Sequence, residues 1–449
     1  MKENSQSPMS GEKMVELCKK HTFFSWSAQN AVNPIPWSKA EGIYFWDANG
    51  KRYTDLSSQL VSVNLGYGNQ YVIDAIKAQA EGITYAGPTM VTQVRAELGE
   101  MLAKYTPGDL NMFFFTLGGA EANESAIKLA RQYTGRQKIL ARYRSYHGAT
   151  AGAIALTGDP RRWANEPSIP GIIRVFDPYE YRCTFNPDGC EGCSMPCVKH
   201  IEEVIQYEGP ENIAAFFLET ITGTNGMIVP PPGYMKAVRE ICDKYGILMI
   251  CDEVMVGLGR TGRWFSIDHW DVVPDIITMA KGLTASYLPL GCVAMSDKIA
   301  AHFGDNVFYG GLTYNAHPMC LAAGKAVLET LVRDDLVGNS AQMGKVMAEL
   351  LADLKQKHPS VGDVRSLGLF GGIELVKNRE TKEMMAPYNG TSEPMTKIGG
   401  YLKEKGISTL IHWNKIFTSP PLIINEQQLR ETFAVVDEAL EITDKFVEE

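Results

Sequence analysis

Short apolar runs alternate with helix-like segments through the middle of this 449-residue chain, between about residues 110 and 300. The runs are continuously apolar, which is typical of strands buried on both faces of a sheet. Strands of this kind that are separated by helices favour a mostly parallel sheet with helices on both sides. The runs that we expect to form strands are residues 112–116, 138–142, 213–218, 247–251 and 275–279, and one helix is expected over residues 233–245.

The C-terminal part of the chain has a different pattern. From about residue 340 a helix-like segment, 341–357, precedes a strand-like segment, 371–376. The chain ends in an amphipathic helix, because apolar side chains recur at helical spacing. These side chains are Leu429, Phe433, Val436 and Leu440. The pattern is therefore α+β rather than a regular alternation.

The N-terminal part contains a predicted β-hairpin. Residues 42–47 and 52–56 read as strands, and Asn49-Gly50 between them is a strong turn signal. We assign both ends of the chain to one smaller domain beside the central sheet. The predicted class is therefore α/β, with residues 66–335 as a large domain and residues 1–65 and 336–449 together as a smaller α+β domain.

Composition excludes several classes of protein. The net charge of −9 argues against a surface that binds nucleic acid or an anionic membrane. The polar start predicts no secretion signal, and no stretch approaches the roughly 18 apolar residues of a membrane span. Nine cysteines, an odd number, fit the reducing cytoplasm better than a disulfide framework. We therefore expect a cytoplasmic protein without a membrane or nucleic-acid partner.

Residues of types that can bind a ligand or take part in a reaction follow the predicted strands. Gly119, His147, Glu219, Asp252 and Lys281 each come directly or a few residues after one of the apolar runs. In parallel sheets, ligands bind beyond the carboxyl ends of the strands. The spacing therefore predicts that these five residues meet in one site.

Lys281 and Asp252 form the most informative pair. Lys281 begins a loop of glycine and small residues after an apolar strand, where its amine is placed to form a Schiff base and to act as a base. Asp252 ends a buried strand and needs a partner there, which a protonated pyridine nitrogen would provide. Together they predict pyridoxal 5'-phosphate (PLP), to which a protein supplies lysine and aspartate. A helix-capping aspartate and a solvated lysine are the competing interpretations.

Other residues complete a candidate cofactor site. Gly119 and Ala120 lie in a glycine turn before a helix, where backbone N–H groups bind phosphate. Tyr146 is the candidate for stacking on the pyridine ring, with His147 beside it, and Val254 for supporting the other face. A plain strand–helix turn and ordinary packing of a tyrosine are the alternatives.

With these residues assembled, the chain resembles the class III (ω-) aminotransferases of PLP fold type I, the aspartate aminotransferase-like fold. The resemblance spans nearly the whole chain, and its strongest motif is residues 250–262 joined to residues 275–291. It implies ping-pong amino transfer in a homodimer with active sites at the interface; further pairing into tetramers stays open. It also implies that Thr313 binds the PLP phosphate of the partner, and that Glu219 and Glu253 line the site.

Departures from the family pattern bear on the substrate. Residues 118–121 read Gly-Gly-Ala-Glu where many members have Ser-Gly-Ser-Glu, and residues 219–223 read Glu-Thr-Ile-Thr-Gly instead of Glu-Pro-Val-Gln-Gly. Phe417 stands where several relatives place an arginine for an α-carboxylate. A guanidinium suits a carboxylate or a sulfonate, so we expect Arg161 or Arg162, with Trp26, to bind the acid group of the substrate. A solvated arginine pair is the alternative.

This pattern is similar to ω-aminotransferases whose substrates carry the amino group away from an α-carboxylate. The leading hypothesis is taurine as amino donor, with 2-oxoglutarate or pyruvate as acceptor. Alternatives are β-alanine, 4-aminobutyrate or a general amine:pyruvate activity, and within the same fold an aminomutase or a decarboxylase. A PLP-binding regulator would need a DNA-reading domain and a basic face, which the sequence lacks.

A cysteine cluster offers a separate hypothesis. Four thiols lie within fifteen residues, which would suffice for a structural zinc site, although their spacing of six, two and three is not the usual two pairs. We interpret them as packing residues and expect no metal, while leaving the question to metal analysis. The four are Cys183, Cys190, Cys193 and Cys197.

Overall fold

A seven-stranded sheet forms the centre of the protein in the computed structural model, which describes residues 9–186 and 195–448. Its strand order is β4-β10-β9-β8-β7-β5-β6. Only β10 pairs antiparallel with its neighbours, so the sheet is mostly parallel and the predicted α/β class is confirmed. The strands are β4 (Met112–Thr116), β5 (Lys138–Arg142), β6 (Ile172–Val175), β7 (Ile213–Glu219), β8 (Leu248–Asp252), β9 (Ile276–Met279) and β10 (Gly291–Met295).

The central strands are buried on both faces, which explains their continuous apolar runs. Every residue of β7, β8 and β9 is buried. Phe216 and Leu218 pack into the core under α8, whereas Phe217 between them packs into the core under α5. All five predicted strands are therefore present at the predicted places.

Eight helices in the described part of residues 66–335 surround this sheet. Helix α5 packs on β9 and β10, α8 packs on β8 and against α7, and α10 packs against α3 and α4. None of the helices that the described ranges contain has the length and apolar character to cross a bilayer. They are α3 (Gln70–Glu81), α4 (Gln93–Ala103), α5 (Gly119–Thr134), α6 (Ala151–Leu156), α7 (Pro196–Glu208), α8 (Tyr234–Tyr245), α9 (Asp297–Asp305) and α10 (Pro318–Arg333).

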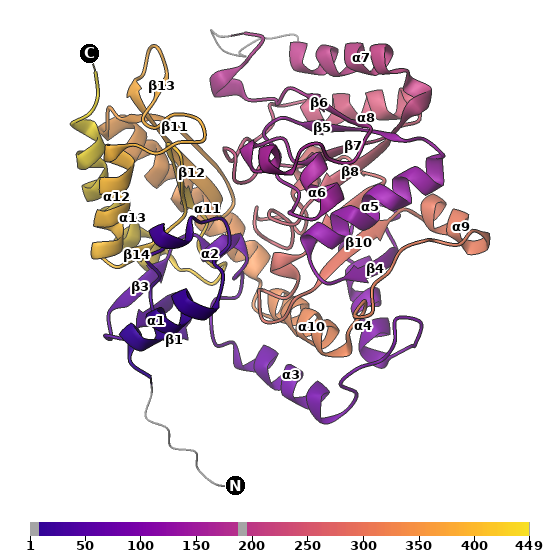
Figure 1. Ribbon diagram of the computed structural model, residues 1–449, viewed down its shortest axis with the longest axis horizontal. Coiled ribbons are helices and arrows are strands. Elements are labelled where there is room, and N and C mark those ends of the chain that lie inside the picture. Colours follow the sequence, from indigo (N-terminus) through magenta and orange to yellow (C-terminus); the bar gives the residue numbers. More distant parts are fainter. Residues whose placement is uncertain (1–8, 187–194, 449) are drawn as a thin grey trace.

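The two ends of the chain lie side by side, in indigo and yellow to the left of the large sheet (Figure 1). They share a sheet of order β1-β2-β3-β14, because Ile407 of β14 pairs with Thr54 of β3. The predicted hairpin is β2 and β3, and Gly50 in its turn has a φ of +83° that favours glycine. This pairing supports one domain made from both ends, while its boundaries at residues 65 and 335 stay predictions. The strands are β1 (Trp37–Glu41), β2 (Tyr44–Asp47), β3 (Arg52–Asp55) and β14 (Ile407–Ser408).

The C-terminal part adds a second sheet of order β11-β12-β16-β15, with β13 paired to β12. Helix α11 packs on β11, and α12 packs against α13. The predicted helix 341–357 is the main part of α11, and the predicted strand 371–376 lies inside β12. These elements are β11 (Val361–Leu367), β12 (Phe370–Asn378), β13 (Glu383–Met384), β15 (Ile411–His412), β16 (Lys415–Thr418), α11 (Leu336–Lys357), α12 (Glu393–Glu404) and α13 (Glu426–Asp444), with α1 (Gly11–His21) and α2 (Ser58–Val61) near the N-terminus.

Candidate active site

A cavity of about 930 Å³ lies at the carboxyl ends of the parallel strands. Glu219 and Asp252 are the last residues of β7 and β8 and face each other in the strand register. Lys281 follows β9, so the topology brings three residues predicted from separate strands to one edge. The sequence-predicted residues that line the cavity are Trp26, Gly119, Ala120, Tyr146, His147, Arg161, Glu219, Asp252, Val254, Lys281 and Phe417.

Asp252 is buried and held by three donors. Its Oδ2 accepts hydrogen bonds from His147 Nδ1 and Asn123 Nδ2, both at 2.8 Å. Its Oδ1 accepts the backbone N–H of Val254 at 2.9 Å. A carboxylate has about four lone-pair sites, so Oδ1 retains capacity for one more donor. The arrangement orients the carboxylate firmly and leaves an acceptor for a ligand N–H.

Lys281 lines the same cavity and has an unusual backbone. Its φ is +36°, a left-handed conformation that an L side chain adopts only when its surroundings impose it. Burial lowers the pKa of Lys281 to about 8, although the carboxylates of Asp252 and Glu219 oppose this effect. A substantial neutral fraction therefore exists near pH 8, and a neutral amine is the nucleophilic form.

Glu219 is a buried carboxylate that organises the loops beside it. Its Oε1 accepts the backbone N–H of Tyr146 at 2.9 Å, and its Oε2 accepts that of Gly223 at 2.7 Å. Burial raises the pKa of Glu219 and the neighbouring Asp252 raises it further, whereas His147 lowers it. Glu219 thus ties the segment after β5 to the segment after β7.

The N-terminus of α5 opens on the cavity at Gly119 and Ala120. The first N–H groups of a helix have no partner within the helix, and the helix dipole favours an anion there. A Cβ atom at Gly119 would lie 2.7 Å from Val254 Cγ1, so only glycine lets the turn approach the segment after β8 this closely. The site therefore combines an anion-binding helix end with the Asp252 carboxylate and the Lys281 amine.

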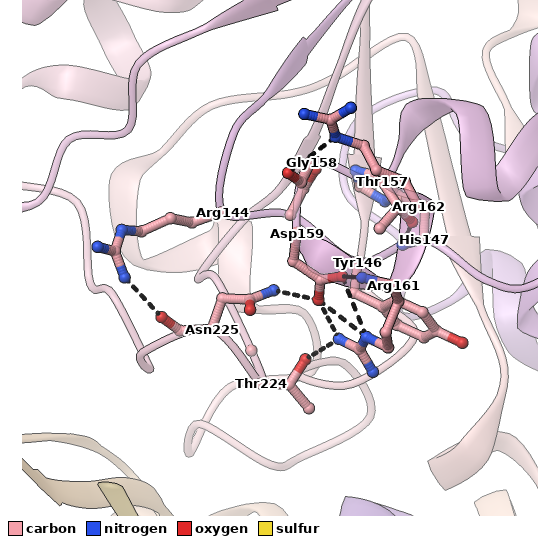
Figure 2. Close-up of polar contacts among 12 residues, drawn as sticks. Arg144, Tyr146, His147, Thr157, Gly158, Asp159, Arg161, Arg162, Thr224 and Asn225 are labelled. Carbon is pink, nitrogen blue, oxygen red and sulfur yellow. Dashed lines mark hydrogen bonds and ion pairs between the residues drawn. The ribbon is translucent and has the colours of Figure 1, made fainter. Parts of the chain in front are cut away.

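Arg161 brings a guanidinium to the cavity from a short 3-10 helix, η2 (Pro160–Asn165). Its Cζ lies 3.5 Å from the centroid of the Tyr146 ring, and its Nε donates to Asp159 Oδ2 at 2.9 Å (Figure 2). Burial raises the pKa of the Tyr146 hydroxyl, while the charge of Arg161 lowers it. Trp26 is 64% exposed at the same cavity and Phe417 is fully buried beside it. One wall of the cavity is therefore formed by aromatic side chains together with the guanidinium of Arg161.

Three predicted residues do not line this cavity. The guanidinium of Arg162 forms an ion pair with Glu166 and donates to the carbonyl of Gly158 at 3.2 Å. Thr313 is exposed, and its carbonyl accepts the hydroxyl of Tyr85. Glu253 points away from the site and accepts the backbone N–H groups of Ser266 and Ile267, both at 2.9 Å; burial raises its pKa to about 8. Of the two candidate arginines, only Arg161 faces the cavity.

Other residues of the site were not predicted. Asn123 lies one helical turn after Gly119, so the spacing alone would have placed it on the same face of α5. Thr224 and His412 line the cavity, and Asp159 holds Arg161. Burial lowers the pKa of His412 to about 4, with the charges of Arg161 and Lys415 adding to the effect. The sequence gives no signal for Thr224 or His412, because each reaches the cavity through the three-dimensional fold.

The cysteine cluster lies partly outside the described residues, because Cys190 and Cys193 fall in 187–194. Cys183 is half-buried, and Cys197 is buried in the first turn of α7. Elsewhere in the described chain, no group of three or more histidine, cysteine, aspartate or glutamate residues has the geometry of a metal site. The absence of a metal at the four cysteines stays a prediction.

Fold and site together define the class of PLP-dependent aminotransferases, and comparisons with known proteins identify the family. The chain matches the family Aminotransferase class-III over residues 26–440. It is 35% identical to the taurine–pyruvate aminotransferase of Bilophila wadsworthia, over 95% of this chain and 96% of that protein. It is 38% identical to the taurine–pyruvate aminotransferase of Rhodobacter capsulatus, over 79% of each chain.

A solved structure extends the match to three dimensions. The taurine:2-oxoglutarate aminotransferase from Bifidobacterium kashiwanohense, in complex with PLP and glutamate, superposes with a TM-score of 0.94 at 42% identity. The alignment covers 98% of this chain and 99% of that chain. The protein belongs to the class III aminotransferases. It is accordingly a PLP-dependent transaminase with the α/β architecture of fold type I.

The residues in the cavity fit this cofactor. Asp252 Oδ1 retains an acceptor position for a ring N–H, and the α5 N-terminus offers unpaired amides for a phosphate. The amine of Lys281 lies in the same cavity with a lowered pKa. Tyr146 and Val254 contribute apolar surface to the cavity that these three groups share. Acceptor, anion site and amine are the three groups that PLP requires of a protein.

Proposed function

We propose that the protein transfers the amino group of taurine, or a similar ω-amino acid, to 2-oxoglutarate or pyruvate. The observation that carries this proposal is the position of Arg161. It is the only arginine among the described residues that line the cavity, and it shares that cavity with Lys281. Phe417 supplies no charge at the place where several relatives bind an α-carboxylate. The relatives named for taurine in Bilophila, Rhodobacter and Bifidobacterium support the choice of donor.

In this proposal PLP supplies the electron sink of the reaction. Lys281 Nζ is the amine that would hold the cofactor, and once free it would accept the proton from the carbon that bears the substrate nitrogen. Asp252 Oδ1 would accept the ring N–H and so keep that nitrogen protonated. The N–H groups of Gly119 and Ala120 would hold the phosphate, and Tyr146 and Val254 would support the ring from the cavity walls.

Arg161 and Trp26 orient the substrate in both half-reactions of the ping-pong cycle. A guanidinium binds the acid group of the donor, which places the amine at the other end of the molecule near Lys281. The acid group of the acceptor occupies the same position in the second half-reaction. His147 and Glu219 act through the residues that they hold, Asp252 and the backbone of Tyr146.

Amino-donor profiling tests the proposal. The cofactor-loaded enzyme is supplied with taurine, β-alanine, 4-aminobutyrate and a simple alkylamine at equal concentration, with each oxo acid in turn. Taurine is expected to give the highest kcat/KM. β-Alanine or 4-aminobutyrate strongly outcompeting taurine would refute the sulfonate part and favour the β-alanine or 4-aminobutyrate activity. Turnover without an oxo acid, or release of CO2, would favour an aminomutase or a decarboxylase.

We also propose that the enzyme is a cytoplasmic homodimer in which Thr313 binds the partner's PLP phosphate. Thr313 is exposed in its own chain, and Tyr309, Leu312 and Tyr314 around it are large exposed side chains. Contiguous exposed apolar surface of this kind favours a protein interface. Free buried thiols such as Cys251 and Cys292 support a reducing compartment. Sedimentation of the wild type and of Thr313→Ala, read at the absorbance of the cofactor, tests the dimer and the role of Thr313. Both proteins are expected to be dimers, and the variant is expected to retain less PLP. A monomeric wild type would refute the homodimer.

A further inference from the structure

The guanidinium of Arg161 has three of its N–H groups engaged by the protein. Nε donates to Asp159 at 2.9 Å, and Nη2 donates to Asp159 and also to Thr224 Oγ1 at 2.9 Å (Figure 2). A guanidinium has five N–H groups. The two on Nη1 have no hydrogen-bond partner among the described residues, so Nη1 is the atom that Arg161 presents to a substrate.

Thr224 completes this surface with a donor of its own. Its Oγ1 accepts the N–H of Arg161, which leaves its hydroxyl hydrogen free to donate in another direction. The residue is half-buried and lines the same cavity as Arg161 and Lys281. Two N–H groups of Nη1 and one O–H of Thr224 therefore lie next to each other on the cavity wall.

Asp159 holds Arg161 directly and contacts Asn225, the residue that follows Thr224. It is 1% exposed and also accepts a hydrogen bond from Asn225 Nδ2 at 2.9 Å. Its Oδ1 also accepts the backbone N–H of Arg161 at 2.9 Å, which caps η2. The ring of Tyr146 covers a face of the guanidinium. Arg161 is thus held along one edge and one face, with little freedom to turn Nη1 away from the cavity.

We propose that Thr224 is a further specificity-determining residue, which binds the acid group of the amino donor together with Arg161 Nη1, and that Asp159 is the positioning residue for this pair. The inference rests on the proposed function, in which Arg161 binds the acid. A sulfonate has three acceptor oxygens and a carboxylate has two. The Thr224 hydroxyl donates to the third oxygen, so it favours a sulfonate over a carboxylate of the same length.

Binding of unreactive acids isolates this subsite from the chemistry. Ethanesulfonate and propionate have the acid groups of taurine and β-alanine but no amine. Their Kd values are measured by calorimetry on the cofactor-loaded enzyme. Thr224→Val removes the hydroxyl at nearly constant volume and is expected to weaken ethanesulfonate binding by about tenfold or more, with a smaller effect on propionate. Thr224→Ser keeps the hydroxyl and is expected to bind both acids as the wild type does.

Kinetics provide the second measurement. Thr224→Val is expected to lower the ratio of kcat/KM for taurine to that for propylamine, mainly through the KM of taurine. Asp159→Asn is expected to raise the KM of taurine and of β-alanine alike, since it loosens Arg161 for any acid. Equal losses for taurine and propylamine in Thr224→Val, or an unchanged Kd for ethanesulfonate, would overturn the inference.

Arg161→Met separates this inference from the proposed function. If Arg161→Met leaves the taurine-to-propylamine ratio unchanged, the acid site is elsewhere, and the roles proposed for Arg161 and for Thr224 both fail. If Arg161→Met lowers the ratio and Thr224→Val does not, the acid site stands and only the role of Thr224 is refuted. If both Arg161→Met and Thr224→Val lower the ratio and Thr224→Ser does not, an acid site made of Arg161 and Thr224 is supported.

Discussion

His147 Nδ1 lies 2.8 Å from Asp252 Oδ2, and both side chains are buried at the carboxyl edge of the central sheet. The two residues come from different crossovers, since His147 follows β5 and Asp252 ends β8. A carboxylate accepts hydrogen bonds, so the imidazole N–H donates and fixes the direction in which the carboxylate points. Asn123 donates to the same oxygen at 2.8 Å, so Oδ1, which accepts only the backbone N–H of Val254, is the oxygen with an acceptor position left.

Asp252→Asn should test this orientation, because the amide keeps the shape of the side chain and removes its charge. A full charge about 3 Å from a ring nitrogen contributes about 5 kcal/mol at an effective dielectric constant of about 20, so kcat/KM should fall roughly 10³-fold or more. The measurement is steady-state kinetics on enzyme saturated with PLP. His147→Phe, which removes one donor to Asp252, should cause a smaller loss. A loss below tenfold in Asp252→Asn would contradict the assignment.

Lys281→Ala should abolish turnover while the protein still binds PLP reversibly, because the phosphate and ring contacts remain. Borohydride should fix the cofactor to the wild type and not to the variant, as detected by mass spectrometry. Lys128→Ala, which alters an exposed lysine on α5, serves as the matched control and should behave as the wild type. Substantial residual transamination in Lys281→Ala would refute the role of this lysine.

The lowered pKa of Lys281 predicts how capture of the cofactor depends on pH. Only the neutral amine attacks an aldehyde, so the rate of PLP capture by cofactor-free protein should rise with pH through about 8 and then level off. An ordinary lysine, with a pKa of 10.5, would place this rise more than two pH units higher. Stopped-flow absorbance over a pH series measures the rate. A rise that begins only near pH 10 would show that the amine is solvated.

The buried strands and the reactive residues at their ends could be predicted because each is marked by a short stretch of neighbouring residues. Continuous apolar runs mark β7, β8 and β9, and Glu219, Asp252 and Lys281 stand where those runs stop. Two strands of the central sheet, β6 and β10, were not predicted, although β10 is itself a continuous apolar run. β6 has an arginine among four residues, and β10 follows β9 without an intervening α-helix, which breaks the alternation on which the prediction relied.

Contacts made across the fold were not predictable in the same way. Thr224 meets Arg161 across 63 positions, and Asn225 meets Asp159 across 66, through a loop whose sequence departs from the family pattern. Of the neighbouring Arg161 and Arg162, only the structure shows which one faces the cavity, because the bends of a short 3-10 helix decide the direction of each side chain. The sequence indicated which residue types would carry the reaction, whereas the side chains that hold them became visible only in the folded structure.

Glu374 in β12 links the two parts of the molecule through buried charges. It accepts hydrogen bonds from Arg182 Nε at 2.5 Å, from Arg365 Nη2 at 2.6 Å and from the hydroxyl of Tyr179. Tyr179 and Arg182 follow β6 of the central sheet, whereas Arg365 lies in β11. Burial alone would raise the pKa of Glu374, but Lys415 and the two arginines hold it well below its ordinary value.

Glu374→Gln should destabilise the folded protein by about 3–5 kcal/mol at pH 7, because it leaves buried guanidinium groups without their counter-charge. The matched control is Glu383→Gln, which alters an exposed pair with Lys377 and should cost about 0–1 kcal/mol. A carboxyl group with a depressed folded-state pKa stabilises above its unfolded pKa of about 4.5 and loses this effect as the pH falls. The difference between wild type and Glu374→Gln in urea unfolding should therefore shrink below pH 4.5, and equal unfolding midpoints at pH 7 would show that the buried charges contribute nothing to the link.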